Sequence, residues 1–200
     1  MYASLEPLPV PNDKLLQDAC RRFNSENALM EDALKQLREQ FPENKEIPHV
    51  LLKVLVLNKL YNTRVNDVDV PILARHIAQL RLDDAIGQGD PTVVGRIYTC
   101  EGLRKYYSFA TKFCSWHNPE AYPIYDSYAE ECLWAYRKQP ANQEGFATFR
   151  RQDCWYYDKY KEVVNAFRTH YRLDHFTFKE IDKFLWQTGE RIKMQKHQLK

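Results

Sequence analysis

The sequence predicts an all-α fold, a compact multi-helix domain in which two helical lobes could flank a cleft. The chain has only six glycines in 200 residues, and its apolar residues recur at helical spacing along nearly its whole length. No stretch alternates in the way that a half-buried strand requires. With 44% hydrophobic and 28% charged residues, the composition is that of a globular chain that can bury a core.

Cap residues and prolines mark five helices in the first half of the chain. Residues suited to the N-cap, or prolines suited to the first turn, stand at the expected starts. These are Asn12 or Asp13, Ser25, Glu46 before Pro48, Asp69 before Pro71, and Asp90 before Pro91. The helix that starts at Ser25 is expected to end before Pro42. The helix after Glu46 is apolar on nearly all sides and should be a buried central helix ending near Asn62.

Four further helices are expected in the second half. An apolar stripe runs from Tyr106 to His117 and stops at Asn118-Pro119, and a connection through Pro123 leads to a helix that includes Ala129 to Tyr136. A looser region surrounds Pro140 and Gly145. Beyond it, helices are expected from Trp155 to about Tyr171 and from a capping box at residues 177–180 onward.

Nothing divides the chain into separate domains, so we expect one helical domain over residues 1–200. Residues 150–200 carry 12 Lys and Arg against 7 Asp and Glu, although the whole chain has a formal charge of only +2. This basic, aromatic C-terminal part is compatible with a polyanionic partner, and a solvated helix face would have the same composition.

Several classes of protein are disfavoured. The longest apolar run, residues 50–57, contains a lysine and is too short to cross a bilayer, and the N-terminus lacks a signal pattern, so we expect a cytoplasmic protein with no membrane partner. The five cysteines include no C-x-x-C pair, which disfavours disulfides, zinc and iron–sulfur clusters. Cys114 and His117 would form only half a metal site. We therefore expect no metal and no cofactor.

Asp126 is the most conspicuous candidate for chemistry, because it follows a proline-containing connection and stands at the start of a helix. Residues 127–130 match a capping box, so Ser127 could cap that helix and leave the Asp126 carboxylate just outside its positive end. A carboxylate fixed there could orient a water or stabilise the positive charge that develops in glycosidic bond cleavage. The alternative is that Asp126 is simply the cap.

A second candidate is the stretch LVLNKLYNTRV, residues 55–65. Its polar side chains Asn58, Asn62, Thr63 and Arg64 emerge from the end of an apolar helix and could meet a phosphate or a base edge. Capping and turn formation explain Asn62 and Thr63 equally well. The aromatic cluster at residues 155–160 could stack on bases, or it could be a packed helix edge.

Taken together, the two stretches resemble the helix-hairpin-helix superfamily of DNA glycosylases. LVLNKLYNTRV is similar to that family's L-x-x-Q-Q/N-T pattern, and YPIYDSYAEECL is similar to its V-D-T-H-V motif, which would make Asp126 the catalytic aspartate. The resemblance covers roughly residues 46–138. The family's L-P-G-V-G hairpin is absent, since CEGLRKYYSFATKF stands in its place, and no four-cysteine iron–sulfur pattern follows.

The resemblance implies a DNA-binding enzyme that hydrolyses the N-glycosidic bond of a modified or damaged base. The nucleophilic lysine of bifunctional members is replaced by Tyr107, so the implied mechanism activates water. Asn58, Asn62, Thr63 and Arg64 would contact DNA, and Tyr107, Lys112 and His117 would line the pocket. The alternative is a non-catalytic helical protein that binds nucleic acid or another protein.

Overall fold

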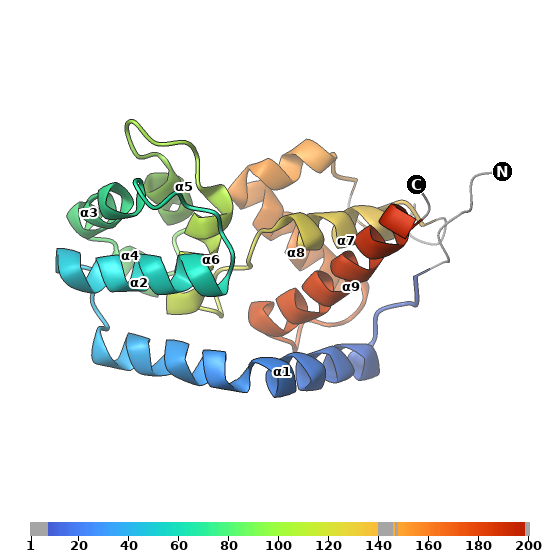
Figure 1. The fold of residues 1–200 in the computed structure, drawn as a ribbon. Helices are drawn as coiled ribbons and strands as arrows, with labels where there is room; N and C mark the ends of the chain where they lie inside the picture. The colour runs from blue at the N-terminus through green and yellow to red at the C-terminus, as the bar shows by residue number, and fades with distance from the viewer. Residues whose placement is uncertain (1–7, 140–145, 147, 199–200) are drawn as a thin grey trace. The chain divides into compact units, whose positions relative to one another are not determined.

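The structure is a computed structural model that describes residues 8–139, 146 and 148–198 (Figure 1). All regular secondary structure in these ranges is helical, which confirms the all-α prediction. The α-helices are α1 (Asp13–Gln40), α2 (Ile47–Leu60), α3 (Val70–Leu80), α4 (Asp83–Gly87), α5 (Thr92–Tyr98), α6 (Tyr107–His117), α7 (Ser127–Arg137), α8 (Tyr157–His170) and α9 (Phe178–Gln198), and the 3-10 helix η2 (Arg151–Trp155) precedes α8. The looser region expected around Pro140 and Gly145 lies outside the described residues.

Most of the expected helix starts are confirmed. The Asn12 side chain accepts a hydrogen bond from the Leu15 amide at 3.1 Å and so caps α1, and Pro48 lies in the first turn of α2. At α9 the capping box is complete, because the Thr177 amide donates to the Glu180 carboxylate at 2.8 Å and the Glu180 amide donates to the Thr177 hydroxyl at 3.2 Å.

The helix break expected at Ser25 is wrong. Helix α1 continues through Ser25 for 28 residues to Gln40. The sequence between Asp13 and Gln40 contains neither glycine nor proline, and a serine inside a helix costs only a few tenths of a kcal/mol relative to a better helix former. A residue that favours caps therefore does not end a helix whose other residues all support it.

The chain divides into two compact units. Unit 1 comprises Met1–Phe23 and Pro123–Lys200, and unit 2 comprises Asn24–Tyr122, so α1 begins in unit 1 and ends in unit 2. The prediction of a single domain stays a prediction. None of the described helices is long and apolar enough to span a bilayer.

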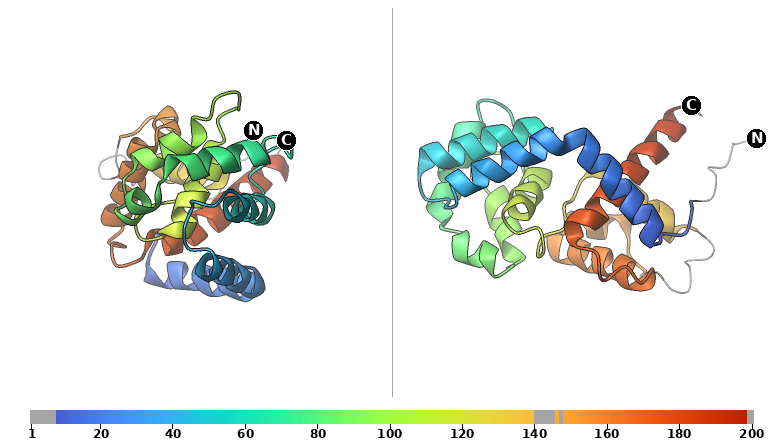
Figure 2. Two further views of the ribbon diagram at one scale, coloured as in Figure 1. Left: turned by 90° about the vertical axis from the view of Figure 1, so that its left-hand side faces the viewer. Right: turned by 90° about the horizontal axis from the view of Figure 1, so that it is seen from below.

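Unit 2 is organised around the apolar helix α2. This helix packs against α3 and α6, and α5 packs against α3 and α6 (Figures 1 and 2). Leu57, Ile77, Phe109 and Phe113 are fully buried among these helices. The expectation that α2 is a buried central helix is confirmed for one face only, because Leu52 and Leu55 are more than 40% exposed.

Unit 1 is organised around the close pair α7 and α9, which lie side by side in Figure 1. Gly189 of α9 allows the approach, because a Cβ atom at this position would lie 2.0 Å from the Tyr128 carbonyl oxygen of α7. Tyr136 of α7 is fully buried and contacts the rings of Phe167 and Phe184. The pair α7 and α9 thus holds the start of α7, where Asp126 lies.

Candidate functional site

The turn at residues 61–65, which we call the α2 turn, is built by the side chain of Asn58. The Asn58 amide group donates to the Val65 carbonyl at 2.8 Å, and its oxygen accepts from the Val65 amide at 2.9 Å and from the Thr63 hydroxyl at 2.8 Å. The last turn of α2 thereby holds the middle and the far end of the following turn. Asn58 and Thr63, both predicted as DNA contacts, have their polar groups bound within the turn.

Two residues of the α2 turn have left-handed backbone conformations. Asn62 has φ 48° and Arg64 has φ 59°, and the side chains of both are exposed. Asparagine tolerates this region, whereas a left-handed conformation costs an arginine about 1–2 kcal/mol. The turn therefore holds a strained arginine and presents an amide and a guanidinium group to solvent.

Residues before α6 brace the α2 turn from a second side. The Arg104 guanidinium donates to the Arg64 carbonyl and lies 4.7 Å from the Tyr106 ring. The Tyr106 hydroxyl donates to Asp69 and accepts from the Asn66 amide at 3.2 Å. The sequence did not indicate these contacts, because Arg104 is 40 residues from Arg64, and Tyr106 is 40 residues from Asn66, the residue that follows the turn.

Helix α6 carries two of the predicted pocket residues. The Tyr107 ring lies edge-on to the ring of Tyr98 at 5.6 Å. Lys112 is buried, and its ammonium group donates to the Tyr61 carbonyl at 3.4 Å and lies 5.9 Å from the Tyr61 ring. Lys112 therefore links α6 to the first residue of the α2 turn.

His117 ends α6 in an aromatic environment beside two cations. Its ring lies 4.9 Å from that of Phe113 and 4.6 Å from that of Trp116. Burial lowers the pKa of His117 to about 3, with smaller contributions from the charges of Lys53 and Arg38. Its Nε2 atom is buried and has no hydrogen-bond partner among the described residues. His117 is thus neutral at physiological pH.

A buried lysine network lies in the same unit as His117. The Lys53 ammonium donates to the Glu43 carbonyl and to the Asn44 side chain, each at 2.9 Å, and the Asn44 amide group donates to Asp83 at 2.7 Å. Burial lowers the pKa of Lys53 to about 8, against the opposing effects of Asp83 and Glu43. Because Lys53 is completely buried, we assign this network to the stability of unit 2.

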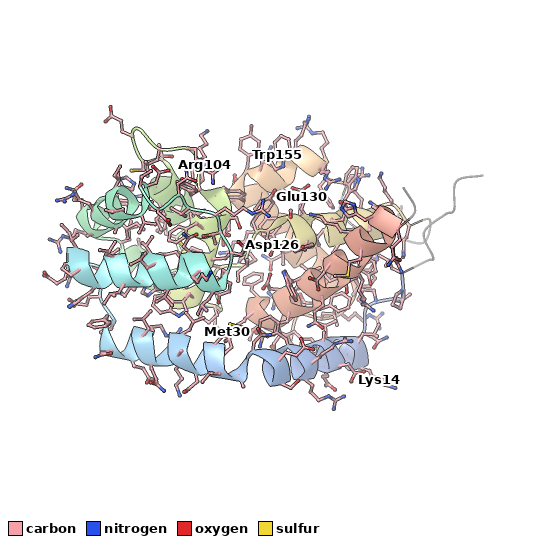
Figure 3. The ribbon with its side chains drawn as sticks, in the orientation of Figure 1. Lys14, Met30, Arg104, Asp126, Glu130 and Trp155 are labelled. Carbon is pink, nitrogen blue, oxygen red and sulfur yellow. The ribbon has the colours of Figure 1, made fainter. Side chains whose placement is uncertain are left out.

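Asp126 is the N-cap of α7. Its side chain, labelled in Figure 3, accepts hydrogen bonds at Oδ1 from the Tyr128 amide at 2.9 Å and from the Ala129 amide at 2.8 Å. The interpretation that Asp126 is itself the cap is therefore confirmed, and the possibility that Ser127 caps this helix is wrong. Ser127 lies inside α7 and its hydroxyl accepts from Lys193 at 2.7 Å, and Asp126 has the extended backbone conformation that a cap requires.

The connection before Asp126 is held by tyrosines. The Tyr157 hydroxyl donates to the Pro123 carbonyl at 3.2 Å, and the Tyr160 hydroxyl donates to the Ile124 carbonyl. The Tyr125 hydroxyl donates to Glu130, and burial, followed by this hydrogen bond, raises the pKa of Tyr125. The position of the Asp126 carboxylate is thus fixed from both sides.

Two buried carboxylates follow Asp126 on α7. Glu130 accepts from the Arg151 side chain, and Glu131 accepts from Arg151 at 2.9 Å and from Lys196. Burial by itself would raise the pKa of Glu131, but the hydrogen bonds from Lys196 and Arg151 outweigh it, and the pKa is lowered. This network joins α7 to η2 and α9.

The predicted site residues fall into two groups. Asp126 belongs to unit 1, whereas unit 2 contains Asn58, Asn62, Thr63, Arg64, Tyr107, Lys112 and His117. Within unit 2 the fold brings Asn58, Thr63 and Lys112 to the α2 turn. The described residues contain no group of three or more His, Cys, Asp or Glu side chains suited to hold a metal ion.

Part of the chain matches a known protein family. Residues 15–121 match the family model HI_0787_N, described as an N-terminal domain, and this match ends one residue before the end of unit 2. An uncharacterized protein from Haemophilus influenzae is 38% identical over 150 residues, which cover 73% of this chain and 69% of that protein. No solved structure matches. Because the family model matches more than half of the chain, this protein belongs to the HI_0787_N family.

Proposed function

We propose that this protein binds nucleic acid, in the first place DNA, through the α2 turn. The observation that carries the proposal is the strained, exposed Arg64 beside the exposed Asn62 in a turn braced by Asn58 and Arg104. Strained backbone persists only where the surrounding structure enforces it, and it is concentrated at functional sites.

The exposed groups of the turn suit a phosphate backbone. The Arg64 guanidinium can donate to phosphate oxygens, and the Asn62 amide group can donate to a phosphate or to a base edge. Asn58, Thr63 and Lys112 support the turn through hydrogen bonds.

A cytoplasmic location is part of the proposal, because DNA would be accessible to the protein there.

Arg64→Ala tests this contact. Alanine at position 64 keeps the left-handed strain and removes the charge, so the expected loss of duplex affinity is about tenfold at low salt, with a smaller slope of affinity against salt concentration. Fluorescence anisotropy with a labelled DNA duplex measures both quantities. Lys35→Ala is the matched control, since it removes another exposed cation of unit 2. Equal binding by the two variants would exclude the α2 turn as a contact.

Hydrolysis of an N-glycosidic bond is the second candidate function. It is favoured by the fixed carboxylate of Asp126, held by two amide hydrogen bonds behind a connection braced by Tyr157 and Tyr160. A positioned carboxylate can orient a water or stabilise developing positive charge without reorganisation. The monofunctional glycosylase activity implied by the resemblance to helix-hairpin-helix enzymes requires such a group.

Asp126→Asn separates this chemistry from capping. Asparagine is as good an N-cap as aspartate, so the variant should fold and bind DNA as before. Base release is measured on duplexes and single strands that contain diverse modified bases, by strand cleavage with alkali at abasic sites. We expect release by the parent protein and none by the variant. Release by both proteins would remove Asp126 from the mechanism, and release by neither would leave only the binding proposal.

A further inference from the structure

Unit 1 exposes an adjacent pair of aromatic side chains. Trp155 is 55% exposed and Tyr156 is 59% exposed, and every other Phe, Tyr and Trp side chain in the described ranges is buried or half-buried. Cys154 and Tyr157, on either side of the pair, are buried. The pair therefore does not belong to a generally frayed segment. It projects from the junction of η2 and α8.

The ring of Trp155 is held in its exposed position. Its indole N–H donates to Glu130 Oε2 at 3.3 Å, and both residues are labelled in Figure 3. Glu130 is in turn bound by Arg151 and Tyr125. Because the side chain is already ordered, a ligand that stacks on it pays little conformational entropy. The hydrogen bonds of the buried Glu130 on α7 thus hold the Trp155 ring in a fixed, exposed position.

The surface continues along α7. The ring of Phe149 contacts that of Trp134 at 6.0 Å, and Arg151 and Trp155 contact Glu130, one helical turn before Trp134. Residues 149–155 therefore run along α7 from Trp134 to Glu130. We call the half-buried Trp134 and the exposed Trp155 and Tyr156 the aromatic face.

Cations accompany the rings of the aromatic face. Arg137 and Lys138 lie 5.0 Å and 5.1 Å from the Trp134 ring, and Lys159 lies 5.5 Å from the Tyr156 ring. Arg150 and Lys159 both form ion pairs with Asp153, at 3.3 Å and 3.8 Å, and their side chains are 76% and 48% exposed, whereas that of Asp153 is only 16% exposed. The positive groups are thus more accessible than the carboxylate between them.

We infer that the aromatic face binds single-stranded nucleic acid, with bases stacked on Trp155 and Tyr156 and phosphates bound by Arg150 and Lys159. Aromatic rings interleaved with cations are the arrangement that binds single strands without sequence preference. In a duplex the bases are stacked on one another, so a duplex could contact the cations of this surface through its phosphates but could not stack on the aromatic rings. The inference rests on the proposed function and adds a second surface and a strand preference to it.

Tyr156→Ala is the most direct test, because it removes an exposed ring at the end of η2. Anisotropy with the full chain and labelled oligo-dT and oligo-rU of about 12 nucleotides should show binding at least about fivefold weaker than that of the parent protein. Duplex affinity should be unchanged, and Tyr156→Phe should bind as the parent does. Met194→Ala, which removes another exposed apolar side chain of unit 1, is the control and should have no effect.

Trp155 needs two variants, because alanine also removes the hydrogen bond to Glu130. Trp155→Phe keeps a ring and should retain most of the single-strand affinity, whereas Trp155→Ala should lose it. Unchanged single-strand affinity in both Tyr156→Ala and Trp155→Ala would overturn the inference. A protein partner that is lost with Tyr156→Ala, while the parent binds no oligonucleotide, would also overturn it.

The two proposals fail in different ways. If Arg64→Ala weakens duplex binding while the Tyr156 and Trp155 variants bind single strands normally, the α2 turn stands and the aromatic face is excluded. If the aromatic variants weaken single-strand binding while Arg64→Ala has no effect on duplex binding, the aromatic face stands and the α2 turn is excluded.

Discussion

Asp126 joins a structural and a candidate chemical role in one side chain, and two substitutions can separate them. Asp126→Ala removes both hydrogen bonds to the first turn of α7 and should lower the free energy of unfolding by about 1 kcal/mol. Asp126→Asn should leave it nearly unchanged. Urea unfolding of both variants measures the difference. Equal losses would show that the charge of the carboxylate, and not the cap, stabilises the helix.

Gly189 is the residue on which the approach of α9 to α7 depends most directly. The Cβ atom of Gly189→Ala would lie 2.0 Å from the Tyr128 carbonyl oxygen, a backbone atom that cannot move aside without shifting α7. We expect a loss of stability of roughly 3 kcal/mol or more, as for severe overpacking. The measurement is thermal or urea unfolding of the variant beside its control.

The control for Gly189→Ala is Gly95→Ala in α5. A Cβ atom at position 95 meets no atom within 4 Å, and the position lies inside a helix. This substitution should raise stability by up to about 1 kcal/mol, because alanine is the better helix former. If both substitutions destabilised to the same degree, the contact with Tyr128 would not be the cause.

At the scale of the elements, we expect the α2 turn to keep a destabilising residue, Arg64, because that residue contributes to duplex binding. Arg64→Gly removes a left-handed strain of about 1–2 kcal/mol and costs about 0.5–1 kcal/mol of added entropy in the unfolded chain. The net result should be a gain of about 0.5–1 kcal/mol together with weaker duplex binding. Urea unfolding and anisotropy on the same sample measure the two effects.

Arg172→Gly is the matched control for the turn. Arg172 has φ 58°, nearly the value of Arg64, but it follows α8 in unit 1. The Arg172→Gly variant should show a similar gain in the free energy of unfolding and should bind duplex DNA as the parent protein does. A loss of binding in both variants would point to a general effect of charge and not to the α2 turn.

Helix starts could be predicted from the sequence because their signals are local. Asn12, Pro48 and the Thr177 capping box each act within one helical turn, and each marks a real helix start. The errors have the same origin. Ser25 and Ser127 both belong to sequence patterns that favour an N-cap. Ser25 does not start a helix, because the helix formers on both sides of it continue α1. Ser127 does not cap α7, because Asp126, one residue earlier, is the cap.

The bracing of the candidate site could not be predicted in the same way. Arg104 binds the α2 turn from 40 residues away, Tyr106 binds the adjacent Asn66 from 40 residues away, and Arg151 binds Glu130 from 21 residues away. No pattern within a single helix encodes such contacts. The sequence indicated the polar residues of the turn, but it could not indicate that Asn58 faces inward while Asn62 and Arg64 face solvent.

At the scale of the whole molecule, the two units differ in the ionisable groups that they bury. Unit 2 buries His117 as a neutral ring, with a pKa lowered from 6.5 to about 3. Unit 1 buries Glu131 as a paired carboxylate, with a pKa below its usual 4.5. In both cases the unfolded chain binds the proton more tightly, so both units lose stability as the pH falls. The pH at which the loss begins differs.

Acid should therefore weaken the two units in sequence. His117 of the unfolded chain is half protonated at pH 6.5, so unit 2 should lose stability from about that pH down toward pH 3, by roughly 1 kcal/mol per pH unit. The contribution of Glu131 is lost only below about pH 4.5. Variants that keep one tryptophan, Trp116 in unit 2 or Trp186 in unit 1, report each unit by fluorescence during urea unfolding.

Between pH 6.5 and pH 4.5, the urea midpoint reported by Trp116 should fall, while that reported by Trp186 should remain nearly constant. His117→Gln should flatten the Trp116 response in this range, because glutamine does not titrate. Glu131→Gln is the matched control: it should lower the Trp186 midpoint at every pH, because Arg151 and Lys196 lose a charged partner, and should remove the further fall of that midpoint below pH 4.5. Parallel midpoints for both reporters at every pH would mean that the two units unfold as one, in which case His117 governs the acid sensitivity of the entire chain.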